Sequence, residues 1–413
     1  MEHEIYLSEE GAISYVKKNT SIFGDQEILH ATVLAGDSME VDGNANRILR
    51  VHSESSEQSV IVKQVLPFIR VAMERGEVLP ISMERMRTEI QYMNAANRIC
   101  ESITPEIYAW DQKSGTVVME DLKKMKILRF ELMEGNKFPA FPEKFGSFLG
   151  RIAFLTSDLH LDPWEKRTME NYFGASKSNH MWGRFMFDDT VLSNQDNPIN
   201  PLVREWVDQL YRDESVRREV RVLKSIFNQQ QQCLIHTDLH TSNIFISLDE
   251  VKVFDSEFAK FGPIGFDLGR LIGSLALNFA SLFGLKEWDQ AKRKDYQVYL
   301  LESIQFLYEA FEASYFGLWN EIFPQRKAAK ERMKAMIFQQ TLGFTACTML
   351  ARIYDGALCF DFKRIESLEE RAKGQRFAIE MAKRLLIRRY EYKDMAQVMD
   401  DMREVSLHRN QAW

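Results

Sequence analysis

The polar segment 236–243 has residue types that suit phosphoryl transfer. It holds Asp238, and Asn243 follows five residues later. Asp255 comes 12 residues after Asn243 and opens an Asp-Ser-Glu triplet that ends at Glu257. Short apolar runs flank these residues, and buried polar groups are costly to leave unpaired, so packing alone does not account for them. In kinases, the first Asp of such a series orients the acceptor hydroxyl, and the Asn and the second Asp hold magnesium.

Two histidines in the same segment, His236 and His240, raise the alternative of a metal-dependent hydrolase. The chain has no H-E-x-x-H motif and no third histidine at an evident ligand spacing, so this alternative is disfavoured. We expect His236 to brace the segment by hydrogen bonds, and Asp267 to brace it or to begin a helix rather than to bind metal. The kinase interpretation is favoured, with Asp238 as the catalytic residue.

A kinase also needs a cation on a strand to contact the α- and β-phosphates of the nucleotide. Lys63 meets this need, because it ends the β-branched run 59–63. A helix is expected over residues 83–99, and Glu89 within it could pair with Lys63, although Glu89 is not the only acid there.

The nucleotide needs backbone partners as well. The small-residue run 42–47, which contains Asn44, is expected to form a turn between strands and could fold over phosphates with its amides. It lacks the G-x-G-x-x-G pattern, so an ordinary hairpin turn is an equal alternative. A further expected strand leads into Leu122, and we expect the backbone from Glu120 to Leu122 to hydrogen-bond the adenine edge.

Patterns along the chain predict two lobes of different composition. After a helical pattern in the first 35 residues, short alternating or β-branched runs predict strands at 46–51, 59–63, 107–110 and 116–119. Further on, helical patterns cover 141–161, 200–227, 286–316 and 327–353, and short strands are expected at 233–235, 243–246 and 251–254. The predicted class is α+β, with a nucleotide-binding N-terminal lobe, residues 1–122, and a mainly helical catalytic and substrate-binding lobe, residues 123–413.

Composition and charge exclude several classes of protein. Hydrophobic residues make up 45% and charged residues 27% of the chain, which is typical of globular domains rather than disordered or collagen-like chains. The net charge of -7 argues against a broad basic surface for nucleic acid or anionic lipid. The four cysteines lie far apart without a C-x-x-C motif, which argues against a zinc site or a disulfide framework.

The most apolar stretch, residues 271–285, is shorter than a membrane span. It has about 15 residues, whereas crossing a bilayer takes roughly 20. We therefore expect a buried helix there. The acidic N-terminus lacks the basic-then-apolar order of a secretion signal. Together these features predict a cytoplasmic protein that binds neither membrane nor nucleic acid.

Several stretches resemble the methylthioribose kinase family, within the aminoglycoside/choline kinase-like superfamily. They are Asp42–Asn46, Val60–Arg70, Phe154–Leu159, His236–Thr241 and Asp255–Asp267. The pieces VKQ-x-LP-x-x-R and F-x-TSDL are not general kinase motifs. The resemblance implies a bilobal, protein-kinase-like fold and transfer of the γ-phosphate of ATP to the 1-hydroxyl of 5-methylthioribose, in methionine salvage.

The resemblance also implies roles for individual residues. Asp238 would be the catalytic residue that meets the sugar, and Lys63 would contact the nucleotide phosphates. Asp255 and Glu257 would hold Mg²⁺. ATP and Mg²⁺ are thus the implied cofactors, a small sugar is the implied substrate, and the chain is expected to form a homodimer as members of the family do.

The chain departs from the family pattern at several positions. Thr237 stands where Gly is usual, and Ser256 replaces a usual Pro. Asn243 stands where the family often has Ser, and it matches the Asn that binds metal and nucleotide in the wider superfamily. The family's paired arginines near the C-terminus are reduced to Ala351 and Arg352, so Arg352 alone is expected to face the substrate. This loss bears on the identity of the sugar more than on the kinase chemistry.

Two alternatives stay open at this point. A kinase of the same fold could phosphorylate another small sugar, an amino alcohol or an aminoglycoside, and a panel of acceptors would separate these. The chain could instead bind a nucleotide without catalysis. The second alternative is disfavoured because Lys63, Asp238, Asn243 and Asp255 are all present.

Overall fold

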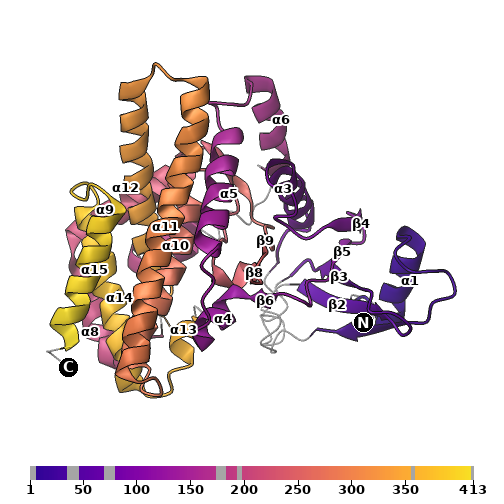
Figure 1. The fold of residues 1–413 in the computed structure, drawn as a ribbon, viewed down its shortest axis with the longest axis horizontal. Coiled ribbons are helices and arrows are strands. Elements are labelled where there is room, and N and C mark those ends of the chain that lie inside the picture. Colours follow the sequence, from indigo (N-terminus) through magenta and orange to yellow (C-terminus); the bar gives the residue numbers. More distant parts are fainter. Residues whose placement is uncertain are drawn as a thin grey trace. The chain divides into compact units, whose positions relative to one another are not determined.

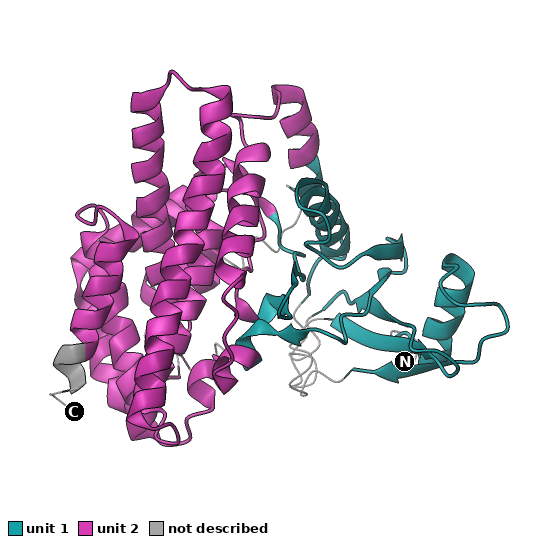
Figure 2. Cartoon of the chain, viewed as in Figure 1, with its two compact units in different colours: residues 1–130, 171–178, 242–259 teal, residues 131–170, 179–241, 260–413 magenta. Residues whose placement is uncertain are grey.

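The computed structural model has a mixed helix and sheet fold, so the predicted α+β class is confirmed (Figure 1). It describes residues 6–34, 46–68, 80–173, 183–192, 198–354 and 359–410. The chain divides into two compact units, which Figure 2 colours separately. Unit 1 consists of residues 1–130, 171–178 and 242–259, and unit 2 of residues 131–170, 179–241 and 260–413. The functional division at residue 122 stays a prediction.

A five-stranded antiparallel sheet forms the centre of unit 1, in the order β1-β2-β3-β5-β4. Its strands are β1 (Leu29–Val33), β2 (Asn46–Ser53), β3 (Ser59–Val65), β4 (Ile107–Asp111) and β5 (Thr116–Glu120). Two helices of this unit are α1 (Glu9–Asn19) and α3 (Arg85–Ile99). The four strands predicted before residue 122 are confirmed, each extended by one or two residues.

The two faces of this sheet pack against different helices, because side chains alternate along a strand. On β3, Val62 belongs to a core cluster with Val16 of α1. Val65 belongs instead to a cluster with Ile90 of α3. Lys63 shares the odd-numbered positions of β3 with Val65, so its side chain lies on the α3 face of the sheet.

A three-stranded sheet also belongs to unit 1, in the order β6-β8-β9. Its strands are β6 (Lys126–Ile127), β8 (Ile244–Ile246) and β9 (Val251–Val253). The backbone amide of Val253 donates to the carbonyl of Ile103 at 2.8 Å. The β8–β9 hairpin thereby carries Asp255, which lies two residues beyond β9, into the same unit as the larger sheet.

Unit 2 is mainly helical, with one small antiparallel pair of strands, β7 and β10. These strands span Cys233–Ile235 and Lys260–Gly262. Its helices are α5 (Phe141–Leu155), α8 (Arg204–Arg212), α9 (Glu214–Gln229), α10 (Gly265–Ser281), α11 (Gln290–Ile322), α12 (Lys327–Ala351), α13 (Phe360–Lys363), α14 (Leu368–Arg388) and α15 (Met395–Asn410). The unit also contains the π-helix η2 (Arg184–Leu192) and the 3₁₀ turns η3 (Pro201–Val203) and η5 (Leu282–Gly284). The 3₁₀ turn η4 (Thr241–Asn243) begins in unit 2 and ends in unit 1. Helices α4 (Leu128–Glu134) and α6 (Pro163–Phe173) run from one unit into the other.

Helix α10 forms the centre of unit 2 and packs closely on α12. Every residue of α10 is buried. A Cβ atom on Gly265 or Gly269 would lie within 2.7 Å of the backbone of Thr341 in α12. Glycine at these positions therefore permits an approach that any larger residue would block. The close packing fixes the side chains that α10 and the end of α12 carry.

The buried helix predicted over residues 271–285 is confirmed by α10 and η5. The helix 265–284 is long and apolar enough to cross a membrane by length and composition alone. However, 94% of its most apolar window is buried inside the protein. This burial is typical of a core helix.

Two predicted elements are wrong in part. The helix expected over the first 35 residues ends at Asn19, and residues 29–33 form strand β1 instead. This strand pairs with β2 along its whole length, and the pairing outweighs its weak local signal. The helix expected over 200–227 is interrupted at Asp213, whose carboxylate accepts the amides of Ser215 and Val216 and begins α9.

Candidate active site

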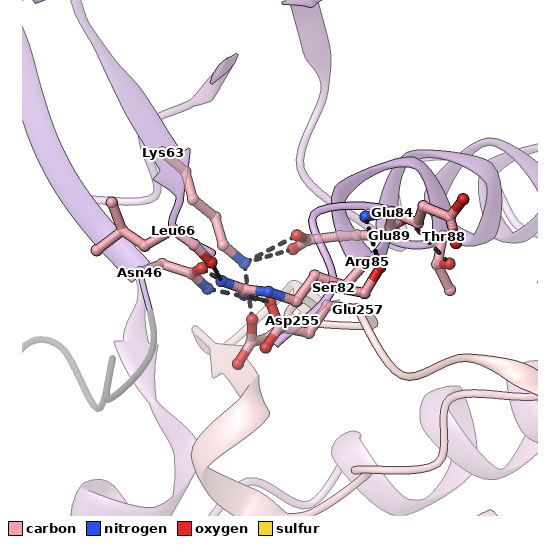
Figure 3. Close-up of polar contacts among 10 residues, drawn as sticks. All are labelled: Asn46, Lys63, Leu66, Ser82, Glu84, Arg85, Thr88, Glu89, Asp255 and Glu257. Atoms are coloured by element: carbon pink, nitrogen blue, oxygen red, sulfur yellow. Dashed lines mark hydrogen bonds and ion pairs between the residues drawn. The ribbon is translucent and has the colours of Figure 1, made fainter. Parts of the chain in front are cut away.

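Lys63, Glu89 and Asp255 meet on the α3 face of the sheet (Figure 3). The ammonium of Lys63 donates to the two carboxylate oxygens of Glu89 at 2.9 and 2.8 Å. It also donates to Oδ1 of Asp255 at 2.7 Å. Lysine on β3 paired with glutamate on the following helix is the ion pair that protein kinases need for catalysis. Of the acids on the predicted helix, Glu89 is thus the one that pairs with Lys63.

Arg85 organises a second set of contacts one helical turn before Glu89. Its guanidinium donates to Oε2 of Glu257 and to the side-chain oxygen of Asn46. It also donates to the carbonyl of Leu66 at 2.7 Å, and Asn46 donates to Glu257 Oε2 at 3.1 Å. Figure 3 shows Arg85 between the ends of β2 and β3 and the Asp255–Glu257 segment. Residues four apart share a helix face, so one face of α3 holds Glu257 through Arg85 and, through Glu89, the Lys63 ammonium that bonds Asp255.

The group has an excess of negative charge. Three carboxylates, those of Glu89, Asp255 and Glu257, offer oxygen atoms within 4.8 Å of one another. Lys63 and Arg85 provide two positive charges against these three. The donor set consists of oxygen atoms only, which suits a hard divalent ion such as Mg²⁺ or Ca²⁺ rather than a softer metal. The residues therefore fit the metal ion that the resemblance implied.

Burial and neighbouring charges have opposing effects on the pKa values of Lys63 and Glu89. Burial lowers the pKa of Lys63, but Asp255, Glu89 and Glu257 raise it more, and the net shift is upward. Burial raises the pKa of Glu89, Lys63 lowers it, and Asp255 and Glu257 raise it again, so that its net shift is also upward. Lys63 is therefore a permanent cation, and the carboxylates compete for it.

The remaining residues predicted for nucleotide and metal lie in several places. Asn243 ends η4, is buried, and its carbonyl accepts the amide of Phe254 at 3.1 Å, next to Asp255. The carboxylate of Glu120 accepts from Lys252 at 2.6 Å, and the carbonyl of Leu122 accepts the amide of Met125 at 2.8 Å. Their predicted contact with adenine stays a prediction. Asn44 lies outside the described residues.

Asp238 lies in unit 2 among basic side chains. Arg270 of α10 donates from Nη2 to its Oδ1 at 2.6 Å, and His240 Nε2 lies 3.5 Å from the same oxygen. Burial would raise the pKa of Asp238, but His240, Arg270 and Arg352 together hold it well below its usual range. Arg352 follows α12, with its guanidinium carbon 6.0 Å from the ring centroid of Phe185. Asp238 is therefore an anion at every physiological pH.

Asp267 braces the segment that carries Asp238. Its carboxylate accepts the backbone amides of His236 at 2.6 Å and Thr237 at 3.1 Å. The bracing role predicted for Asp267 is thus confirmed. Thr237 has a φ of 74°, in the left-handed region where a β-branched residue is strained. A glycine at this position, as the resemblance implied, would adopt this backbone conformation without strain.

Sequence reasoning missed Arg85 and Arg270, and both had a signal. Arg85 lies four residues before Glu89 on the same predicted helix. Arg270 directly precedes the most apolar stretch of the chain. A charged residue in such surroundings is almost always paired when it is buried. Neither signal names the partner, because Glu257 and Asp238 are distant in sequence.

Comparisons with known proteins agree with this geometry. Residues 41–307 match the phosphotransferase enzyme family. Methylthioribose kinase of Geobacillus kaustophilus (strain HTA426) is 30% identical over 352 residues, which cover 84% of this chain and 86% of that protein. Methylthioribose kinase of Exiguobacterium sibiricum is 31% identical over 356 residues, or 85% of this chain and 88% of that protein.

A solved structure of choline kinase from Cryptosporidium parvum Iowa II is also similar. It is 12% identical, with a TM-score of 0.48, and the match covers 92% of this chain and 96% of that one. The family match and the two relatives above extend over most of the chain. The chain therefore belongs to the phosphotransferase enzyme family and, within it, to the methylthioribose kinase family: it is a kinase that uses ATP and a divalent metal ion to phosphorylate a hydroxyl group.

Proposed function

We propose that the chain transfers the γ-phosphate of ATP to the 1-hydroxyl of 5-methylthioribose, with Mg²⁺ as the metal ion. The observation that carries the choice of sugar is the 31% identity to the Exiguobacterium methylthioribose kinase over 85% of this chain. The reaction places the enzyme in methionine salvage. We further propose that it works in the cytoplasm as a homodimer and takes a small sugar, with no nucleic acid or membrane partner.

Residues of unit 1 hold the nucleotide in this proposal. Lys63 contacts the phosphates, and its bonds to Glu89 and Asp255 support this role because they fix the ammonium on one face of the sheet. Asp255 and Glu257 bind Mg²⁺, which when bound neutralises charge on the phosphate oxygens. Asn243, whose carbonyl is bonded next to Asp255, contributes to the metal and nucleotide site.

Further contacts to the nucleotide are proposed from the sequence. The backbone from Glu120 to Leu122 meets the adenine edge, and the run that contains Asn44 covers the phosphates. The bond between Lys63 on β3 and Glu89 on α3 supports this arrangement, since protein kinases combine such a pair with a loop that covers the phosphates.

Asp238 orients the sugar hydroxyl for in-line attack. Its carboxylate is held by Arg270, so it presents a fixed acceptor for the hydroxyl proton. Since its pKa lies below the usual range, it attracts a proton weakly before the reaction. Its role is therefore mainly orientation, in agreement with phosphoryl transfer as a reaction of positioning and charge stabilisation. Arg352 meets the sugar beside it.

A panel of acceptors tests the proposal. The purified full chain is incubated with Mg²⁺, ATP and one of methylthioribose, ribose, 5-deoxyribose or choline, and ADP release is followed while mass spectrometry identifies the product. We expect methylthioribose to give the highest kcat/KM and a 1-phosphate product. A higher kcat/KM for another acceptor would replace the proposed sugar. Nucleotide binding without turnover of any acceptor would favour the non-catalytic alternative.

A further inference from the structure

We propose that Arg270, together with Arg352, makes the chain reject acceptors that carry a positive charge near the reacting hydroxyl. This inference rests on the proposed function in one respect, namely that Asp238 receives the acceptor hydroxyl. It goes further because it names the residues that decide between a neutral sugar and an amino sugar or amino alcohol.

The first observation is the charge balance at Asp238 within unit 2. A lone catalytic carboxylate attracts ammonium groups, since opposite charges a few ångströms apart interact strongly at low dielectric. Here Arg270 occupies Oδ1 at 2.6 Å, and His240 lies 3.5 Å from the same atom. One carboxylate thus faces two guanidinium groups and an imidazole. With His240 neutral, the sum over these four groups is one positive charge. Asp267 also interacts with Arg270, but its carboxylate is bonded to the backbone amides of His236 and Thr237.

The second observation is that Arg270 is held in place. Its side chain is 0% exposed, and its Nη1 donates to the sulfur of Met186 at 3.0 Å while Nη2 donates to Asp238. Gly269, the residue before it, packs directly on the backbone of α12. A guanidinium enclosed in this way has no alternative position, so a cationic acceptor does not displace it from Asp238.

The third observation is that the second cation comes from the neighbouring helix. Arg352 follows the last residue of α12, and it acts on Asp238 electrostatically together with Arg270. Its stacking distance of 6.0 Å to Phe185 places it over an aromatic ring of the same unit. Unlike Arg270, it is only partly buried, so part of its side chain is open to solvent.

The consequence is specificity by repulsion. An acceptor gains nothing from a positive charge at this position and loses free energy by like-charge contact. A neutral polyol can instead accept hydrogen bonds from guanidinium groups, which are donors only. The site as built favours a neutral sugar and disfavours choline-like and aminoglycoside-like acceptors.

The test compares methylthioribose with its 2-amino-2-deoxy analogue, whose ammonium lies one carbon from the reacting hydroxyl. We expect wild-type kcat/KM to favour the neutral sugar by roughly 100-fold, the factor for two unit charges about 6 Å apart at an effective dielectric near 20. Arg270→Met and Arg352→Gln should each lower this ratio at least several-fold. Arg270→Lys, which keeps the charge, should preserve it.

Two controls separate specificity from damage. Arg332→Gln removes an exposed arginine of α12 that lies 20 residues, or about 30 Å along the helix, from Arg352, and should leave the ratio unchanged. Raising the pH above the pKa of the acceptor amine should also abolish the wild-type preference. A merely structural role of Arg270 would lower kcat/KM equally for both acceptors and leave the ratio intact.

The outcomes distinguish this inference from the proposed function. If another sugar replaces methylthioribose in the panel, the same comparison is made with that sugar and its amino analogue. A wild-type enzyme that uses both members of the pair equally overturns the inference. So does an unchanged ratio in folded Arg352→Gln, a variant that remains informative if Arg270→Met does not fold.

Discussion

The charged residues around Lys63 in unit 1 and those around Asp238 in unit 2 differ in the sign of their net charge. Around Lys63, three carboxylates face two cations, and the group is short of positive charge. In unit 2, the guanidinium groups of Arg270 and Arg352 act on the single carboxylate of Asp238, while the nearby acid Asp267 is bonded to backbone amides. In the proposed function, a divalent cation completes the first arrangement, and a neutral or electron-rich acceptor completes the second. The difference shows that the charge of a site, rather than its residue types, indicates which reactant it takes.

The largest expected effect falls on the cluster of unit 2. Asp238→Asn should lower kcat by roughly 10²- to 10⁴-fold, because the neutral amide loses the ion pair with Arg270 and the charge that orients the acceptor hydroxyl. The affinity for ATP should stay unchanged, since the phosphate contacts are assigned to unit 1. Steady-state kinetics and calorimetry with an ATP analogue measure the two quantities. Turnover near the wild-type value would remove Asp238 from the mechanism.

Metal binding gives the corresponding test for unit 1. A non-hydrolysable ATP analogue is added with Mg²⁺ at a concentration of about 100 times the Kd of the complex. It should raise the free energy of unfolding by about 2.7 kcal/mol. Asp255→Asn should lose most of this rise, whereas Asp238→Asn should keep it. Urea denaturation with and without the ligand measures the change. Equal stabilisation of both variants would contradict the separation of roles.

Arg85 extends the test of unit 1, because this cation positions Glu257, one of the carboxylates proposed to hold the metal ion. Arg85→Met leaves Glu257 and Asn46 without their shared donor, and should raise the Mg²⁺ concentration for half-maximal activity roughly 10- to 100-fold. Direct titration with Mn²⁺ followed by electron paramagnetic resonance should show the same loss. Arg98→Met, an exposed arginine on the same helix, is the matched control. An unchanged metal requirement would make Arg85 a purely structural residue.

The smallest effect concerns the backbone beside Asp238. Thr237→Gly should raise the free energy of unfolding by about 1 kcal/mol, because glycine adopts a φ of 74° without strain. Among the described residues, the buried Thr237 hydroxyl also has no hydrogen-bond partner. Thr237→Ala, which removes the hydroxyl but keeps the Cβ, should recover only part of this gain. Chemical denaturation of the wild type and the two variants measures the free energy of unfolding. A glycine variant less stable than the wild type would show that Thr237 is not strained.

Much of the fold could be predicted because its signals are local. The β-branched run that ends at Lys63 predicts a strand, and alternation then fixes the face on which the lysine lies. Strand β1 could not be predicted, because its stability comes from pairing with β2 rather than from its own residues. The break between α8 and α9 at Asp213 has a sequence signal, because aspartate is a common N-cap residue. The helical patterns on both sides nevertheless predicted one continuous helix.

The candidate site was predictable in its residue types and less so in its partners. Lys63, Asp238 and Asp255 have the spacing of a kinase, which local sequence records. The pairing of Arg270 with Asp238 depends on the packing of α10, and the pairing of Arg85 with Glu257 joins residues 172 positions apart. Such contacts are set by tertiary structure, and no pattern within a single segment reports them.

The discontinuity of unit 1 has a consequence for how the chain folds. Its sheet ends at Glu120, yet the acid partners of Lys63 and Arg85 at positions 255 and 257 leave the ribosome more than a hundred residues later. Until then the buried Arg85 lacks its carboxylate partner and the buried Lys63 has only Glu89, which is a costly state. Synthesis from the N-terminus therefore cannot complete this unit early, and a fragment cut at residue 130 would be an unstable, ligand-free piece rather than an independent ATP-binding domain.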